Sequence, residues 1–154
     1  MVDRKRRDRY AELLRHFLAG RITNDDYERR ADQIMASDSG TEDRAIAEVY
    51  QRVWFLYCDI RTHRMSGKWA LPPEGRREAA RWIMFLYGPL EYEWPPLITL
   101  SGCLANLVTL TLWGRIQRAL HKREFQGDID LWPFYRRADY EEALKHPRLL
   151  AGDT

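Results

Sequence analysis

The N-terminal part of the chain alternates between apolar and polar positions with the period of an α-helix. Apolar residues recur at the i, i+3, i+4, i+7 and i+8 spacing that lines one helical face, at Tyr10, Leu13, Leu14, Phe17 and Leu18. This pattern predicts a helix from about Asp3 to Ala19, which Gly20 ends. Thr23 suits the N-cap of a second helix, because Asp26 follows it at the capping-box position. The two predicted helices form a hairpin.

Two longer apolar segments follow and predict the centre of the molecule. Thr41 precedes two acidic residues, so it should open a third helix that reaches about Thr62. The apolar stripe of this helix would consist of Ile46, Val49, Val53, Leu56 and Ile60. Pro72 and Pro73 should start a fourth helix, which Gly88 closes. Both helices carry aromatic residues around much of their circumference, so we expect them to form an aromatic-rich centre.

The remaining patterns are less regular. Residues 97–113 combine a helical spacing of leucines with a strand-like alternation of Thr and Leu, and we favour a helix that continues to about Arg123. Residues 129–134 should be extended, because Pro133 forbids a regular helix there. Asp139 should cap a short helix that ends at His146. The pattern as a whole predicts an all-α fold.

Length and composition fit a single helical domain over residues 1–154, with a mass of 18.4 kDa. We expect a bundle of about six helices, made of an N-terminal hairpin (residues 1–38) and a main helical body (residues 41–146). A chain of this length can be stabilised by burial of apolar surface alone. The sequence therefore calls for no cofactor and no metal.

The nearly balanced charge argues against two classes of partner. The formal net charge of +2 provides no overall field that would attract nucleic acid or an anionic membrane. Asp8 interrupts the basic cluster from Arg4 to Arg9, and we interpret that cluster as a solvated helix face. Residues 97–113 contain too many polar residues for a membrane span. The N-terminus shows no secretory-signal pattern, so we expect a cytoplasmic protein.

One string resembles a known module. Residues 18–29, LAGRITNDDYER, resemble the Gly-x-Ile-Thr-x-x-Glu-Phe core of SHOCT-type helical hairpins, and the resemblance covers about residues 10–36. Such hairpins occur as appendages of bacterial proteins, and the resemblance implies a role in oligomerisation or partner contact. The rest of the chain resembles uncharacterised bacterial proteins that end in a Trp-Pro-Phe and Asp-Tyr-Glu pattern, here beginning at Trp132 and Asp139. That resemblance implies no function.

Asp59 and His63 are the first candidate for chemistry. Their i, i+4 spacing would place them on one face at the end of the predicted third helix. A carboxylate that orients an imidazole is the usual arrangement of a general base, and Arg64 or Arg81 could hold an anionic substrate. This pattern predicts a small hydrolase or transferase. The alternative is that Asp59 and His63 only cap and solvate a helix end.

Two aromatic segments beside charged residues are candidates for partner binding. In residues 91–96 the prolines favour an extended path, with Glu91 and Glu93 on one side and Tyr92 and Trp94 on the other. This would make an acidic lip beside an aromatic anchor that receives an Arg or Lys of another protein. The alternative is a rigid connector whose aromatic residues cover the core.

The second of these segments repeats the theme nearer the C-terminus. Trp132 lies close in sequence to Arg136 and Arg137, and Trp and Arg are frequent in binding hot spots. Alternatively, Trp132 packs inward and the two arginines are solvated.

The absence of catalytic strings decides between the functional hypotheses. The sequence contains no glycine-rich phosphate loop, no Gly-x-Ser-x-Gly elbow and no local metal-ligand spacing. We therefore favour a non-enzymatic bacterial interaction protein, of the inhibitor, immunity or adaptor type, that binds another protein through exposed aromatic and charged residues. Self-association is left open. The alternatives are the hydrolase or transferase and a peripheral membrane protein that associates through residues 97–113.

Overall fold

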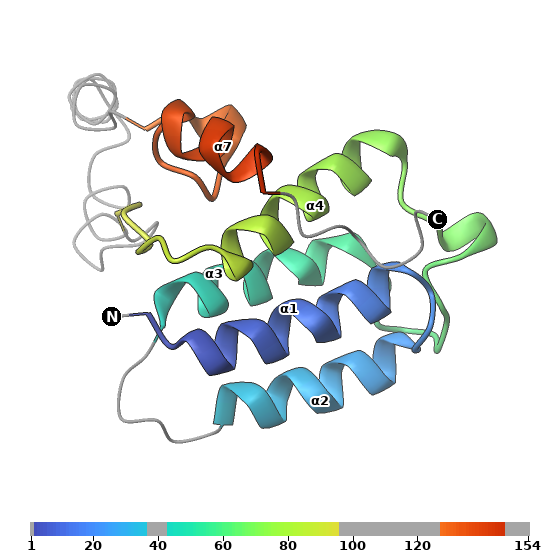
Figure 1. Ribbon diagram of the computed structural model, residues 1–154. Helices are drawn as coiled ribbons and strands as arrows, with labels where there is room; N and C mark the ends of the chain where they lie inside the picture. Colours follow the sequence, from blue (N-terminus) through green and yellow to red (C-terminus); the bar gives the residue numbers. More distant parts are fainter. Residues whose placement is uncertain (1, 37–42, 96–126, 147–154) are drawn as a thin grey trace, which may run out of the picture.

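The computed structural model describes residues 2–36, 43–95 and 127–146 (Figure 1). Within these residues the secondary structure is helical, without a β-strand, which confirms the all-α prediction. The α-helices are α1 (Arg4–Leu18), α2 (Asn24–Ala36), α3 (Arg44–Val53), α4 (Pro73–Tyr87) and α7 (Arg137–Leu144). Short 3-10 turns are η1 (Trp54–Leu56), η2 (Gly67–Trp69) and η3 (Ile129–Leu131).

The N-terminal hairpin has the predicted boundaries because its end signals are local. The Asp3 carboxylate accepts the backbone N–H of Arg6 at 3.0 Å and caps α1. Gly20 has a φ of +67°, which only glycine adopts readily, and so ends α1. The Thr23 hydroxyl accepts the backbone N–H of Asp26 at 3.2 Å, as the N-cap residue of a capping box does, and donates to the Asp26 carboxylate at 3.3 Å.

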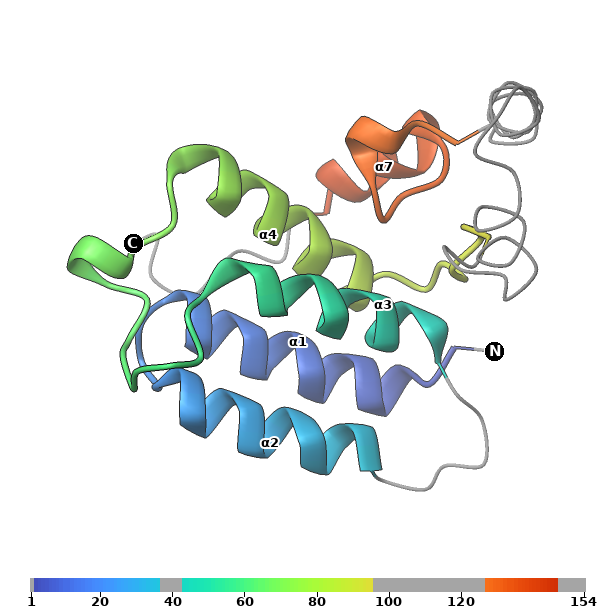
Figure 2. The same ribbon diagram turned by 180° about the vertical axis from the view of Figure 1, so that it is seen from behind.

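α1 lies between α2 and α4 in both views of the ribbon (Figures 1 and 2). α3 packs against one side of this layer, behind α1 and α4 in Figure 1 and in front of them in Figure 2, and α7 lies beyond α4 on the side away from α2. The core side chains of α1 are the predicted stripe, in which Tyr10, Leu14 and Phe17 have no exposed surface. α1, rather than the third helix, is thus the element with helices on both sides.

α4 also matches its prediction. Pro73 occupies the first turn, where its missing N–H has no intrahelical acceptor to lose, and Gly88 is the C-cap. Trp82, Ile83, Phe85 and Leu86 are buried, so the second half of the helix faces the core on most sides. Aromatic rings pack edge to face here, for example Phe85 against Phe134 with centroids 5.1 Å apart.

The third helix is shorter than predicted. It begins after Asp43, whose carboxylate accepts the backbone N–H of Ala45 at 3.1 Å, and it ends at Val53 instead of about Thr62. Ile46, Val49 and Val53 form the buried stripe, whereas Leu56 is half-buried and Ile60 is 84% exposed, so the prediction is wrong beyond η1.

The reason is a side chain from another helix. Asn24, buried at the start of α2, donates to the carbonyls of Cys58 and Arg61 at 3.3 and 3.2 Å and accepts the backbone N–H of His63 at 2.8 Å. These bonds pair two carbonyls and one N–H of residues 58–63, although this segment is not helical. The sequence of residues 58–63 gives no indication of these hydrogen bonds.

Two predictions for the C-terminal segment are wrong in detail. Residues 129–131, within the segment 129–134 that was predicted to be extended, form a 3-10 turn, and the Asp128 carboxylate caps it by accepting the backbone N–H of Asp130 at 3.3 Å. α7 starts at Arg137 with Arg136 as its N-cap, and Asp139 lies within the first turn. The first helical hydrogen bond already runs from Tyr140 to the Arg136 carbonyl. The predicted helix over residues 97–123 lies outside the described residues.

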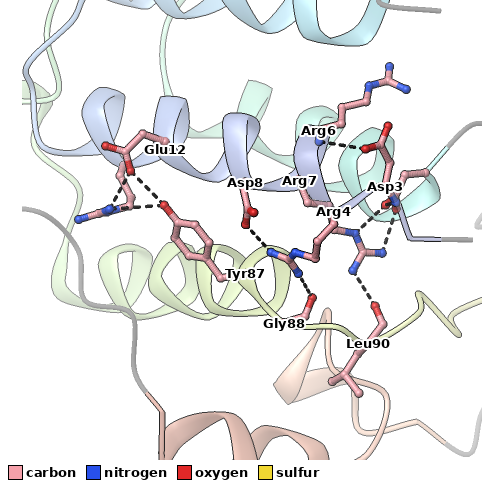
Figure 3. A network of polar contacts seen from close by, with 11 residues as sticks. Asp3, Arg4, Arg6, Arg7, Asp8, Glu12, Tyr87, Gly88 and Leu90 are labelled. Carbon is pink, nitrogen blue, oxygen red and sulfur yellow. Dashed lines mark hydrogen bonds and ion pairs between the residues drawn. The ribbon is translucent and has the colours of Figure 1, made fainter. Parts of the chain in front are cut away.

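Within the basic cluster at the N-terminus, Arg6 and Arg7 form a tertiary junction, whereas Lys5 and Arg9 are exposed, as a solvated face requires (Figure 3). Arg7 donates to both carboxylate oxygens of Asp43 at 2.7 and 2.9 Å and to the Leu90 carbonyl at 2.6 Å. Arg6 donates to the carbonyls of Ile34 and Met35 at 2.8 and 2.5 Å. Both arginines are buried. Their guanidinium groups donate to carbonyls at the ends of neighbouring segments, and buried carbonyls need such donors.

In the described part of the chain, none of the helices combines the length and apolar character that a membrane crossing requires. Residues 97–113, for which the membrane question was raised, lie outside it.

Candidate functional site

The predicted catalytic pair is not assembled. Because α3 ends at Val53, Asp59 and His63 lie on an irregular segment and do not share a helical face. Asp59 is exposed, whereas His63 is only 8% exposed and its ring lies 4.3 Å from that of Trp69. The His63 Nδ1 is 2.8 Å from the Arg61 carbonyl, not from a carboxylate. The His63 side chain therefore stabilises the irregular segment that follows η1, through the Arg61 carbonyl and the Trp69 ring.

The two arginines predicted to hold an anion are engaged elsewhere. Arg64 donates to the carbonyls of Gly20 and Arg21 in the turn between α1 and α2. Arg81, on α4, donates its Nε to the Trp132 carbonyl at 2.9 Å. The structure does not bring either guanidinium to His63. Arg64 and Arg81 serve the fold, each through a backbone carbonyl far away in the sequence.

The two predicted partner-binding segments bind each other. The Trp94 indole N–H donates to the Pro133 carbonyl at 3.0 Å, and the Trp132 indole N–H donates to the Tyr92 hydroxyl at 3.0 Å. Both tryptophans are 3% exposed. The expectation that they are exposed anchors is wrong, because each indole finds its acceptor and its apolar neighbours within the chain.

The charged residues of these segments remain outside. Arg136 pairs with Glu93 at 2.6 Å, and Arg137 pairs with Asp128 at 2.6 Å, with arginine side chains about three-fifths exposed. Glu91 is also exposed. Trp94 therefore covers the core, as the connector alternative expects, and Trp132 packs inward while Arg136 and Arg137 are exposed, as the second alternative expects.

Cation–π stacking completes this junction. The Arg52 guanidinium lies 3.8 Å from the centroid of the Trp132 ring, and Arg44 lies 5.3 Å from that of Tyr92. Burial raises the pKa of Tyr92, although the hydrogen bond from Trp132 opposes it. The Tyr92 hydroxyl is therefore neutral near pH 7 and can accept the indole N–H.

A pocket of about 380 Å³ lies between the end of α4 and α7. Its lining is mainly apolar, with Met84 and Tyr87 from α4, Leu90 from the connector, and Phe134 and Ala143 from the C-terminal segment. Phe134 is fully buried. A hollow of this size can hold one large side chain or a small ligand.

Acidic side chains of α7 form one rim of this pocket. Asp139 and Glu142 line it at i, i+3 spacing, followed by His146. Hydrogen bonding and attraction from Lys145, 2.6 Å away, lower the pKa of Glu142, so its carboxylate is charged near pH 7. Asp139 lies 3.7 Å from Arg136. The acidic lip beside an aromatic anchor that was predicted for Glu91 to Trp94 is a different arrangement, and none of these four residues lines the pocket.

Sequence reasoning missed these residues because Asp139 was assigned to a helix cap. The available signal was the repeat of carboxylates at Asp139 and Glu142 on a helix that also carries Tyr140 and Ala143.

A second apolar feature lies where α3 ends. Trp54 is 45% exposed, Phe55 88% and Ile60 84%. Large apolar side chains this exposed are unusual when a core is available nearby. Of these three residues, Ile60 was assigned to the buried stripe of the predicted third helix, and its exposure contradicts that prediction.

Among the residues that the structure describes, no group of three or more His, Cys, Asp and Glu side chains is arranged to hold a metal ion. In comparisons with known proteins, no protein-family model, no curated protein and no solved structure matches this chain. The resemblance of residues 18–29 to SHOCT-type hairpins stays a prediction.

Proposed function

We propose that this chain is a non-enzymatic protein-interaction module, of the inhibitor, immunity or adaptor type, acting in the cytoplasm of a bacterium. The pocket between α4 and α7 would receive an apolar side chain that stands next to a Lys or Arg of the partner protein. The observation that carries the proposal is the combination of an apolar hollow with a rim of Asp139 and Glu142, whose carboxylates pair with the exposed side chains of Arg136 and Lys145.

The geometry supports this mode of binding in two ways. The apolar wall of Phe134, Met84 and Leu90 can desolvate a large side chain, which is how interface anchors gain affinity. The carboxylates at the rim stay in contact with water, where they favour basic partners and speed association more than they tighten binding. The exposed Phe55 and Ile60 add apolar surface that a partner could also cover.

The hydrolase or transferase alternative has less support, because its four residues are divided between a closed loop and two backbone anchors. The membrane alternative depends on residues 97–113, which the structure does not describe.

Selection from a random peptide library displayed on phage would test the proposal directly. The bait is the whole chain, and the expected consensus places an aromatic or large aliphatic residue within about two positions of a Lys or Arg. The substitution Glu142→Gln should weaken binding of a selected peptide severalfold. Glu141→Gln is the matched control, because it removes the same charge from the neighbouring, exposed position that does not line the pocket.

A substitution that fills the pocket provides a second test of the proposal. Ala143→Trp should abolish peptide binding, whereas Ala138→Trp, on an exposed face of the same helix, should not. Circular dichroism would check that both variants fold. A consensus without basic residues, or equal effects of the paired variants, would contradict the proposal. Sedimentation of the unliganded chain would show whether a second copy occupies the pocket instead.

A further inference from the structure

A groove of about 490 Å³ lies between α1 and α2, formed by residues other than those of the proposed partner pocket. α1 contributes Arg9, Glu12, Leu13 and His16, and α2 contributes Arg30 and Gln33. Leu13 is only 7% exposed and gives the groove an apolar floor. The groove thus combines basic, acidic and apolar side chains. The kind of ligand that it can bind depends on which of its charged side chains already form ion pairs within the chain.

The acidic groups of the groove are committed to partners within the fold. Glu12 accepts the Tyr87 hydroxyl at 3.0 Å and pairs with Arg15 at 2.7 Å and His16 at 3.1 Å. Figure 3 shows the Tyr87 side chain of α4 directed at Glu12. Although burial raises the pKa of Glu12, these hydrogen bonds and charges outweigh it and lower the pKa overall. Asp8, which also lines the groove, pairs with Arg4.

The basic groups of the groove have no such partners. Some exposed arginines of the described segments pair with a carboxylate, as Arg29 does with Asp26, and others donate to backbone carbonyls, as Arg76 does to Leu71. Arg9 and Arg30 form no ion pair or side-chain hydrogen bond with any described residue. Two unpaired guanidinium groups at one groove, in a chain of nearly balanced charge, are a local excess of positive charge.

The packing of the hairpin sets the spacing of these groups. At one end of the antiparallel pair Arg6 reaches the Ile34 carbonyl, and at the other Phe17 stacks on Tyr27 with centroids 4.5 Å apart. Counting inward from both contacts places Arg30 opposite the stretch between Arg9 and His16. Because Nε2 of His16 is bound to Glu12, the unbound ring nitrogen is Nδ1.

We propose that the groove between α1 and α2 binds the phosphate group of a small phosphomonoester, held by Arg9 and Arg30 with His16 at its edge. Guanidinium groups bind phosphate oxygens with two parallel hydrogen bonds, so two of them suit a dianion better than a single carboxylate. The groove is larger than a bare phosphate needs. Its floor of Leu13 and Ile34 would contact the organic part of the ligand.

Titration of the whole chain with phenyl phosphate and with inorganic phosphate, at one fixed pH, tests this site. Calorimetry gives the affinity, and the ring signals of His16, assigned with His16→Gln, give the location. We expect saturable one-to-one binding of phenyl phosphate that shifts the His16 signals, and weaker binding of inorganic phosphate. Arg30→Gln and Arg9→Gln should each weaken binding about tenfold, the effect of losing about 1.4 kcal/mol.

Arg29→Gln is the matched control, because Arg29 is adjacent to Arg30 and is also exposed but does not line the groove. It should change the affinity less than twofold. Binding without a shift at His16, or an equal loss in Arg29→Gln and Arg30→Gln, would overturn the site. Equal affinity for inorganic phosphate would overturn the assignment to a monoester. Since all three arginines are exposed, thermal unfolding should be unchanged in each variant.

Discussion

Arg7 and Asp43 form an ion pair that is almost completely removed from water, with side chains 1% and 2% exposed. The pair also ties α1 to the start of α3, and Arg7 extends the link to the Leu90 carbonyl. Removing one member of such a pair leaves the other charge buried without compensation. Asp43→Ala should therefore lower the free energy of unfolding by about 3–5 kcal/mol, measured by urea denaturation.

The control is Asp8→Ala, which breaks the half-exposed pair between Arg4 and Asp8 on the same helix. Its expected cost is below about 1 kcal/mol, because exposed ion pairs contribute little. Similar costs for the two variants would show that Asp43 is not compensating a buried charge.

Residue pairs also show what sequence reasoning could find. Asp59 and His63 were chosen for their i, i+4 spacing, yet Glu12 and His16 have the same spacing inside a helix whose ends were predicted correctly. Only the second pair is in contact, at 3.1 Å. The spacing rule holds as far as the helix does, so the more secure helix was the better place to apply it.

The interface between α1 and α2 depends on two tyrosines that must stay protonated. Tyr10 and Tyr27 are fully buried and their hydroxyls are 2.7 Å apart. Burial raises the pKa of both well above the ordinary value, although the bond to Tyr27 lowers that of Tyr10 slightly. Above about pH 10 the unfolded chain loses these protons while the folded chain keeps them, so stability is complete below pH 10 and falls above it.

Each tyrosine should contribute a loss of about 1.4 kcal/mol per pH unit in this window, seen as a falling urea midpoint between about pH 10 and 12. Tyr27→Phe should reduce the pH dependence of the free energy of unfolding in this window by about 1.4 kcal/mol per pH unit. An unchanged slope would mean that other groups cause the alkaline unfolding.

The end of α3 is decided by Asn24, whose side chain makes three hydrogen bonds to residues 58–63. Asn24→Ala should leave backbone groups of that segment unpaired and lower stability by about 2–3 kcal/mol. Hydrogen exchange should quicken in residues 57–64 and stay unchanged in α4. Gln51→Ala, at an exposed position of α3, should have no measurable effect. Unchanged exchange in residues 57–64 would remove Asn24 from this role.

The predicted elements divide according to where their signals lie. α1, α2 and α4 carry caps, glycines and prolines at their own ends, and each boundary follows within a residue or two. The break after α3 depends on Asn24, which lies at least 34 positions before the residues that it binds, and α7 starts without a side-chain cap. The pocket joins α4 to α7, so its existence could not be read from either helix alone.

At the scale of the whole molecule, residues 127–146 attach to the helical layer mainly through Trp132. Its ring meets Trp82 edge to face at 5.7 Å and lies under the Arg52 guanidinium, and its carbonyl binds Arg81. Phe134 adds a contact with Phe85. The pocket between α4 and α7 exists only while residues 127–146 are packed in place, because Phe134 and residues of α7 line it.

Trp132→Ala should cost about 3–5 kcal/mol, as other large-to-small changes in a core do. The loss should be local: hydrogen exchange should quicken in residues 128–144 while α1 and α2 keep their protection, because their contacts do not involve Trp132. Peptide binding at the α4–α7 pocket should fall with it, and phosphate binding between α1 and α2 should not. Trp54→Ala, at a half-exposed position, is the control. Uniform loss of protection would mean that the chain unfolds as a single unit, and the two sites would then be coupled through stability.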